Sequence, residues 1–353
     1  MFFEKPPLWR EIQRTNFTDW KQLGQFLELD LLQACHIPHF PLNLPRRLAD
    51  KIEKRSINDP ILRQFLPTMA ETVHVDGFCT DPVGDLPSKT TSKMLHKYQG
   101  RALLLCTSAC AMHCRCCFRQ HFSYASSIKG FAEELQIIQK DSSLNEIILS
   151  GGDPLSLSNR ELGSLLHELG SIEHVKRIRF HTRFPLGIPE RIDPELLEIM
   201  NTSRPQIFFT IHSNHPREWD DEIKSSLKQI QRLGIPLLCQ TVLLKGINDD
   251  VDVLQSLCEI LVDQGIIPYY LHQLDKVSGT LHFEVAEKKG IKLINELTER
   301  LSGYAVPKYV CEIPLEKSKT PVVAAGNSLL HPVERFQAEQ RKPSFEDSTC
   351  CLT

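Results

Sequence analysis

RALLLCTSACAMHCRCC, residues 101–117, joins a short apolar run to a dense group of cysteines. The apolar part predicts a short buried strand. Cys110, Cys114 and Cys117 follow it in a C-x3-C-x2-C pattern, so three thiols would project from one loop at the C-terminal end of that strand. Cysteine thiolates hold iron–sulfur clusters, and three ligands on a four-iron cluster leave one iron open to bind and reduce a small molecule. The stretch therefore predicts a buried strand followed by a cluster-binding loop.

Strand-like runs recur after this first one, and helical patterns lie between them. The clearest helical patterns are at residues 223–233 and 253–262, where apolar residues recur every three or four positions. This alternation demands a parallel sheet with helices outside it, in the α/β class. Candidate functional residues fall at nearly every strand end, so we expect a partial (β/α)6 TIM-like barrel rather than a flat doubly wound sheet. The expected strands are residues 101–106, 146–150, 177–181, 206–211, 236–244 and 268–274.

The rest of the chain is expected to flank this barrel. Residues 1–90 are rich in proline and carry an amphipathic pattern at residues 23–32, which predicts a helical N-terminal cap packed on a core barrel of residues 91–310. Residues 311–332 form a C-terminal extension. The polar residues 333–353 have little to bury and predict a flexible tail.

Composition places the 353-residue chain among ordinary globular proteins, with 41% hydrophobic and 24% charged residues. A net charge of −3 offers no basic surface for nucleic acid. No apolar run approaches the roughly 18 residues that a membrane span requires, so we expect no membrane association. The first residues, MFFEK, do not resemble a secretory leader, and 12 cysteines among many charges suit a reducing compartment. We therefore expect a cytoplasmic protein.

Zinc is an alternative occupant of the cysteine loop. Structural zinc sites usually combine two C-x2-C pairs, and no second pair lies downstream. Cys106 or Cys116 could nevertheless complete a tetrahedron with the others. A zinc-binding structural or interaction protein therefore stays open at this point.

A glycine pair follows the second expected strand. Gly151, Gly152 and Asp153 belong to the sequence SGGDP, and two glycines at a strand end let the backbone approach a ligand closely. The same sequence also suits a simple turn. Its position one strand after the cysteines favours a ligand contact.

Five further segments carry a family resemblance. They are LHKYQGRALLL at 95–105, CFR at 117–119, HSNHP at 212–216, YYLHQLD at 269–275 and SKTP at 318–321. With these motifs in this order, the chain resembles the lysine 2,3-aminomutase family of radical S-adenosylmethionine enzymes from about residue 60 to residue 325. The phrases LHKY, PYYLH and LDKV, together with SKTP, are closest to the branch that forms (R)-β-lysine for elongation factor P.

The resemblance implies an isomerase that converts L-α-lysine to β-lysine by 2,3-amino migration. Its cofactors would be a four-iron four-sulfur (4Fe-4S) cluster, S-adenosyl-L-methionine and pyridoxal 5′-phosphate. Its partners would be the substrate lysine, an electron donor such as flavodoxin or ferredoxin, a second copy of the chain, and functionally elongation factor P with its lysyl ligase. A free-lysine or a glutamate 2,3-aminomutase of the same family remains an alternative.

Cofactor residues follow from the matched motifs. The cluster ligands would be the three cysteines of the C-x3-C-x2-C pattern, and S-adenosylmethionine would lie against the glycine pair and its aspartate. Lys319 would form the Schiff base with pyridoxal phosphate in the 311–332 extension. Relatives carry glycines just ahead of this lysine, whereas this chain has IPLEK at 313–317. The phosphate would be held by Lys97, Tyr98 and Arg101, which could otherwise form a solvated basic edge.

Substrate residues follow in the same way. Arg119 matches the residue that clamps the substrate carboxylate, a task that suits a planar guanidinium. Asp275 and Glu312 match the two acids that receive the side-chain ammonium, and such a pair rejects neutral or acidic side chains. His212 and His215 would contact a cofactor, although each could equally be a hydrogen-bonded core histidine.

Overall fold

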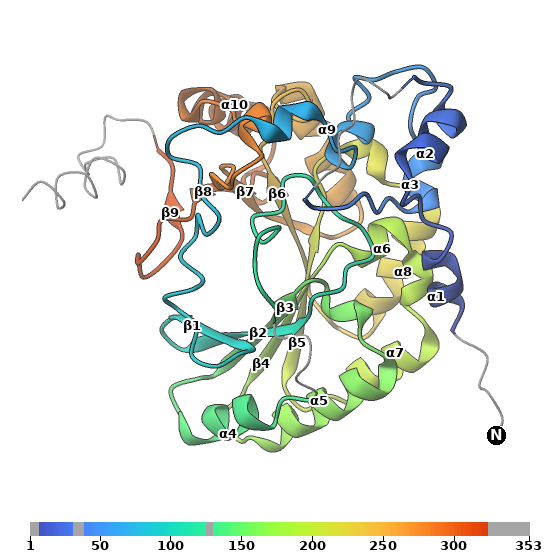
Figure 1. The fold of residues 1–353 in the computed structure, drawn as a ribbon. Coiled ribbons are helices and arrows are strands. Elements are labelled where there is room, and N and C mark those ends of the chain that lie inside the picture. The colour runs from blue at the N-terminus through green and yellow to red at the C-terminus, as the bar shows by residue number, and fades with distance from the viewer. Residues whose placement is uncertain (1–6, 31–38, 125–129, 324–353) are drawn as a thin grey trace, which may run out of the picture.

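The strands lie side by side in the order in which the chain forms them (Figure 1). The computed structural model describes residues 7–30, 39–124 and 130–323. Within these residues β2 to β8 run parallel, while β1 and β9 pair antiparallel at the two edges of the sheet. The nine strands are β1 Met94–Tyr98, β2 Arg101–Thr107, β3 Glu146–Gly151, β4 Arg177–Thr182, β5 Gln206–His212, β6 Leu237–Val242, β7 Ile267–His272, β8 Lys308–Cys311 and β9 Thr320–Pro321.

The connecting helices cover one side of this sheet. A strand order that never reverses sends every right-handed crossover to the same side, so the sheet curls into a barrel, whereas a doubly wound sheet reverses its order. Figure 1 shows the helices along the outside of the curved sheet, from α4 at the bottom to α10 at the top. This arrangement confirms the expected partial barrel of β/α units. The main outer helices are α4 Ala132–Lys140, α5 Asn159–Ser171, α7 Pro194–Asn201, α8 Asp221–Arg232, α9 Val251–Asp263 and α10 Glu287–Arg300.

All of the expected barrel strands form, with ends shifted by no more than two residues. The two expected helices appear as α8 and α9. Each begins after an aspartate whose carboxylate accepts backbone N–H groups of the first turn, Asp220 for α8 and Asp250 for α9. Such caps satisfy donors that would otherwise lack partners, which fixes where each helix starts.

Three strands were not predicted. β1 has the mixed sequence MLHKY and forms because Gly100, at φ 74°, turns the chain back onto β2. β8 and β9 are four and two residues long, too short for a periodic signal. These strands matter because they stand at the two edges of the open barrel.

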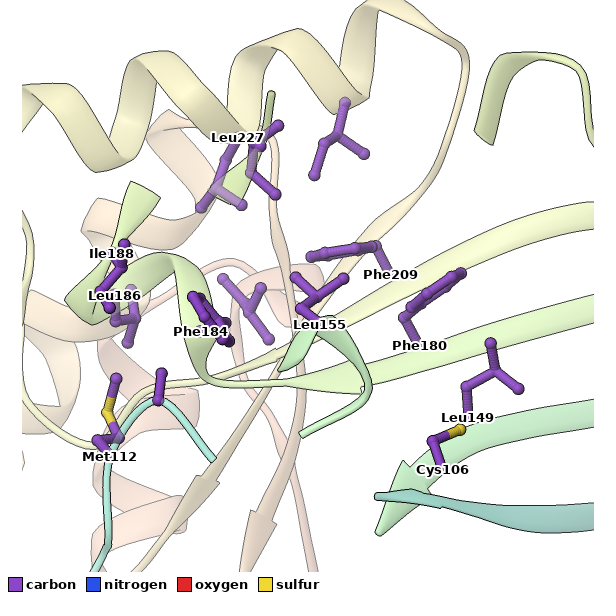
Figure 2. Close-up of a cluster of buried hydrophobic side chains, with 14 of the residues drawn as sticks. Cys106, Met112, Leu149, Leu155, Phe180, Phe184, Leu186, Ile188, Phe209 and Leu227 are labelled. Atoms are coloured by element: carbon purple, nitrogen blue, oxygen red, sulfur yellow. The ribbon is translucent and has the colours of Figure 1, made fainter. Parts of the chain in front are cut away.

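The two faces of the sheet differ in polarity, as β4 illustrates. Phe180 is fully buried, whereas Arg179 and His181 beside it are half-buried. Phe180 stacks on Phe209 of β5 with ring centroids 5.7 Å apart, in the apolar cluster that also contains Leu227 of α8 (Figure 2). The apolar core therefore lies between the sheet and its helices, which leaves the opposite face of the strands to polar side chains.

The N-terminal segment contributes short helices joined by irregular chain. They are α1 Leu8–Gln13, α2 Trp20–Leu27 and α3 Arg46–Asp50, with 3-10 turns η1 Leu62–Gln64 and η2 Met69–Thr72. The amphipathic pattern expected at residues 23–32 gives α2, which ends at Glu28 in a left-handed conformation (φ 57°). The segment packs on the barrel, since Trp9 meets Phe184 edge-on with centroids 5.5 Å apart. The expected tail at 333–353 and the end of the 311–332 extension lie outside the described residues.

No helix in the described part of the chain is both long and apolar enough to cross a membrane.

Candidate active site

The three cysteines of the C-x3-C-x2-C pattern lie together on the loop after β2. Burial raises the pKa of Cys110, and the nearby thiols of Cys114 and Cys117 together with Asp153 raise it further. Burial and Cys114 likewise raise the pKa of Cys117 to about 11. Buried thiols such as Cys110 and Cys117 are stabilised as thiolates when iron supplies positive charge, so the donor set suits a metal cluster.

The two other cysteines of this region face apolar surroundings. Cys106 is 5% exposed on β2 and belongs to the main core (Figure 2). Cys116 is 6% exposed and packs with Leu244 and Phe283. Across residues 7–30, 39–124 and 130–323, no three His, Cys, Asp or Glu side chains are placed to hold a single metal ion. A four-iron cluster takes each thiolate on a different iron, so it does not require the close gathering that one zinc ion requires.

The glycine pair packs directly against the cysteine loop. A Cβ on Gly152 would lie 2.3 Å from the carbonyl oxygen of Ala109, and one on Gly151, at φ 111°, would lie 2.8 Å from that of Thr107. The backbone N–H of Gly152 donates to Thr107 O at 2.6 Å. The glycines therefore allow the end of β3 to touch the backbone that leads to Cys110.

Asp153 ties the same strand ends together. Its buried carboxylate accepts hydrogen bonds from Thr182 Oγ1 at 2.8 Å and from the backbone N–H groups of Leu155, Arg183 and Phe184. The lone pairs of this carboxylate are thus used within the protein. Asp153 follows β3 directly and holds the loops after β3 and β4 in one position.

A group of charged and polar side chains gathers at the open edge of the barrel, which we call its mouth. Lys319, just before β9, donates from Nζ to Glu312 Oε2 at 2.7 Å, and Lys97 of β1 donates to Glu312 Oε1 at 2.6 Å. The hydroxyl of Tyr98 donates to the same Oε1 atom, and the guanidinium carbon of Arg101 lies 4.5 Å from the Tyr98 ring centroid. The first strand of the sheet is therefore joined through side chains to the segment between β8 and β9.

The two acids expected to bind an ammonium differ in charge state. Burial would raise the pKa of Glu312, but Lys319 and Lys97 lower it to about 2. For Asp275, just beyond β7, burial dominates and raises the pKa to about 7, although Lys319 opposes it. The site therefore combines a firmly ionised Glu312 with an Asp275 that titrates near neutral pH.

Arg119 lies close to the glycine pair and is already paired. Its Nε donates to Asp85 Oδ2 at 2.7 Å, and its Nη1 to Ser150 Oγ at 3.3 Å. Asp85 belongs to the N-terminal segment, which therefore reaches the site. No sequence motif singled out Asp85.

The two histidines of the HSNHP motif have local partners. His212 ends β5 with Nε2 3.1 Å from Asn214 Oδ1, and burial lowers its pKa to about 4, so its ring is neutral. His215 accepts the backbone N–H of Arg217 on Nδ1 at 3.1 Å and thereby caps a 3-10 turn.

Several interior residues of the barrel belong to none of the sequence motifs. On β4, burial and the charges of Arg179 and Lys319 lower the pKa of His181. Within the described structure, His181 Nε2 and Arg179 Nε are buried without a hydrogen-bond partner. On β7, burial and Lys319 lower the pKa of His272. The alternation of Arg177, Arg179 and His181 with apolar residues was the available signal, because it marks a strand whose second face is polar.

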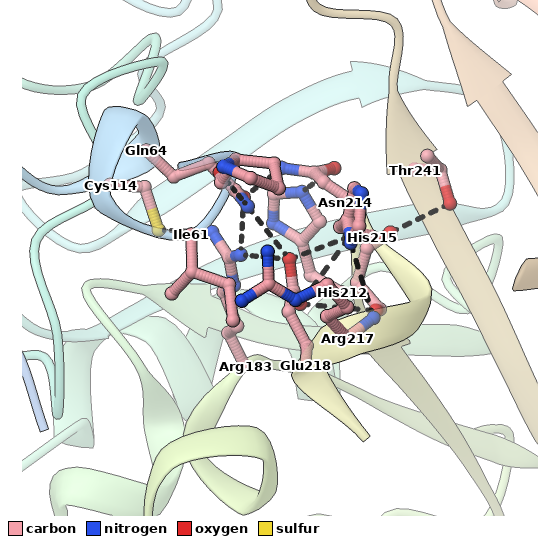
Figure 3. A network of polar contacts seen from close by, with 12 residues as sticks. Ile61, Gln64, Cys114, Arg183, His212, Asn214, His215, Arg217, Glu218 and Thr241 are labelled. Carbon is pink, nitrogen blue, oxygen red and sulfur yellow. Dashed lines mark hydrogen bonds and ion pairs between the residues drawn. The ribbon is translucent and has the colours of Figure 1, made fainter. Parts of the chain in front are cut away.

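A buried arginine next to the cysteines was also missed. Arg183, directly after β4, donates from Nη1 to Cys114 Sγ at 2.8 Å (Figure 3). Arg183 belongs to none of the sequence motifs, so only the folded chain reveals its contact with Cys114.

An open barrel of parallel strands, with a cysteine loop after its first parallel strand and a lysine–acid cluster at its mouth, defines an iron–sulfur enzyme of the α/β class. In agreement, residues 99–188 match the family described as a 4Fe-4S single cluster domain. The chain is 42% identical over 286 residues to the L-lysine 2,3-aminomutase of Escherichia coli K12, covering 80% of this chain and 83% of that protein. It is 39% identical over 319 residues to that of Haemophilus influenzae, covering 88% and 94%. The chain belongs to the lysine 2,3-aminomutase family of radical S-adenosylmethionine enzymes and is an isomerase of that family, as the motifs predicted.

Among solved structures, native anSMEcpe with bound AdoMet aligns at a TM-score of 0.41 with 12% identity, over 56% of this chain and 58% of that one.

Proposed function

We propose that this protein is a pyridoxal phosphate-dependent lysine 2,3-aminomutase that moves the 2-amino group of L-lysine to carbon 3 and yields β-lysine. The observation that carries the proposal is the convergence of Lys319, Lys97 and Glu312 at the mouth of the barrel, with Asp275 nearby. The relatives named L-lysine 2,3-aminomutase support the substrate.

The residues at the mouth fit pyridoxal phosphate. Lys319 supplies the primary amine that such a cofactor needs for covalent attachment. Lys97, Arg101 and the hydroxyl of Tyr98 lie together, and two cations with one donor suit a dianionic phosphate. When bound, the cofactor supplies the conjugated system through which the nitrogen migrates. Glu312 forms ion pairs with the side-chain ammonium groups of Lys97 and Lys319 and holds them beside this site.

The cysteine loop fits a cluster that binds S-adenosylmethionine. Cys110, Cys114 and Cys117 would each hold one iron of the cluster. With S-adenosylmethionine bound, the cluster would supply the radical chemistry of the reaction. Gly151 and Gly152 keep the end of β3 free of side chains beside this loop. The barrel wall then holds the reacting groups in one orientation and excludes water.

Substrate recognition would use both ends of lysine. Arg119 is buried with its guanidinium oriented by Asp85, which prepares it to hold the α-carboxylate. Asp275 and Glu312 would receive the side-chain ammonium. Glutamate would be disfavoured, because its side-chain carboxylate could not replace the ammonium as the partner of Asp275.

The biological setting follows from the same motifs. We propose that β-lysine serves the modification of elongation factor P in the cytoplasm, that a flavodoxin or ferredoxin reduces the cluster, and that the chain forms a homo-oligomer. A free β-lysine pool is the alternative fate of the product.

The test is anaerobic reconstitution with iron, sulfide and pyridoxal phosphate, followed by incubation with S-adenosylmethionine, a reductant and either L-lysine or L-glutamate. Chromatography of derivatised products should show β-lysine from lysine. Faster conversion of glutamate would remove the lysine assignment and leave the radical chemistry standing.

A further inference from the structure

A set of buried polar side chains lies around Arg183 (Figure 3). Its Nη2 atom donates to Gln64 Oε1 at 2.7 Å and to Glu218 Oε1 at 3.0 Å. Its guanidinium carbon lies 5.1 Å from the centroid of the Phe65 ring. Arg183 is only 6% exposed, and both Gln64 and Glu218 are fully buried. Its Nη1 atom points at the sulfur of Cys114, and its buried Nε atom has no hydrogen-bond partner among the described residues.

The acid that orients Arg183 is itself fixed by the fold. Glu218 Oε2 accepts the hydroxyl of Ser213 at 3.0 Å, and that hydroxyl also accepts the indole N–H of Trp219 at 3.0 Å. Gln64 Nε2 donates to Glu218 Oε1 at 3.0 Å. A guanidinium held at so many points loses little freedom when it donates to a further acceptor, so its contact with Cys114 is preorganised.

The contact singles out one thiol of the three. Arg183 places a charged donor on Cys114 from the position just after β4, whereas the acid that balances its charge comes from the turn after β5. Gln64 comes from the N-terminal segment, far away in the sequence. Residues from three separate parts of the fold therefore position the single hydrogen bond from Arg183 to the sulfur of Cys114.

A charged donor on a cluster thiolate has a known physical effect. Reduction adds an electron to the cluster, and a nearby positive charge or N–H donor stabilises this extra charge. The effect is large where water is excluded, because the local dielectric is low. A buried carboxylate beside the cation acts in the opposite direction and limits the effect.

We propose that Arg183 is a positioning residue that raises the reduction potential of the cluster through its hydrogen bond to Cys114, and that Glu218 sets how far the potential rises. This inference rests on the proposed ligation of the cluster by Cys114. It assigns a role in the electron-transfer step to residues that no motif carries. It also gives the N-terminal segment a part in that step, through Gln64.

The experiment is a redox titration of the reconstituted cluster, followed by electron paramagnetic resonance of the reduced state. Arg183→Gln removes the charge and should shift the potential to a more negative value. Arg183→Lys keeps the charge without the two-armed geometry and should lie between that variant and the wild type. Glu218→Gln leaves the cation unbalanced and should shift the potential to a more positive value.

Arg191→Gln is the matched control. Arg191 is also fully buried, but its arms bond to Leu155 O and Asn159 Oδ1 rather than to a cysteine. Its replacement should leave the potential unchanged even if the protein melts at a lower temperature. If Arg183→Gln does not hold a cluster, Glu218→Gln still tests the inference. A more positive potential in that variant supports it, and an unchanged or more negative one contradicts it.

An unchanged potential in Arg183→Gln or Glu218→Gln, or shifts of the same sign in both, would overturn the inference. Failure of the ligation itself has a separate signature, since Cys114→Ala would then retain the full iron content.

Discussion

Lowering the pH from 8 to 6 should weaken the binding of lysine about tenfold, because Asp275 takes up a proton over this range. Burial raises the pKa of this carboxyl to about 7, with Lys319 opposing the rise. At pH 8 the group is almost fully ionised, whereas at pH 6 only about one molecule in eleven carries the charge. The lysine ammonium binds the ionised form, so the affinity falls as the pH drops through the folded-state pKa. The loss corresponds to about 1.4 kcal/mol.

The assay is a titration of the pyridoxal phosphate-loaded protein with lysine at pH 6, 7 and 8, followed by the absorbance of the bound cofactor. Norleucine is the matched ligand, because it has the same α-amino and carboxylate groups without the side-chain ammonium. Asp275→Asn is the matched variant, because it keeps the shape of the side chain and removes its titration. The reasoning is refuted if Asp275→Asn retains the tenfold effect, or if norleucine shows it as strongly as lysine.

Further predictions concern the cofactors and the backbone. Alanine at any one of the three proposed ligand cysteines should abolish stable binding of about four irons and four sulfides, whereas Cys116→Ala should retain them in iron and sulfide assays; the reverse pattern would contradict the ligand assignment. Borohydride reduction and peptide mapping should place the pyridoxyl label on Lys319, and a label on Lys317 would show a shifted register. Gly152→Ala should cost about 1–3 kcal/mol and lower the iron content, since the added Cβ meets a backbone carbonyl at 2.3 Å. Gly303→Ala, with no heavy atom within 4 Å of the new Cβ, is its control, and equal melting temperatures for the two variants would contradict the packing argument.

The sequence predicted the barrel because each parallel strand is an apolar run long enough to stand out between helices. It did not predict β1, because apolar and polar residues do not alternate regularly in MLHKY and because the hairpin depends on one glycine. The motifs assigned Lys97, Lys319 and Glu312 to one site. These residues contact one another, although they come from the two opposite edges of the sheet.

The residues that support the site could not be found in this way. Asp85 and Gln64 are isolated polar residues in an irregular segment, and only tertiary packing brings them to Arg119 and Arg183. The raised pKa of Asp275 likewise depends on burial and on the charges of Lys319 and Glu312, which no local pattern encodes.

The most direct measurement of the proposed activity uses L-lysine labelled with heavy nitrogen at the 2-amino group. The reconstituted protein, with S-adenosylmethionine and a reductant under anaerobic conditions, should convert it to β-lysine that carries the label on carbon 3. Mass spectrometry of the derivatised product locates the nitrogen. Cleavage of S-adenosylmethionine without labelled β-lysine, or β-lysine that has lost the label, would contradict the assignment as a lysine 2,3-aminomutase.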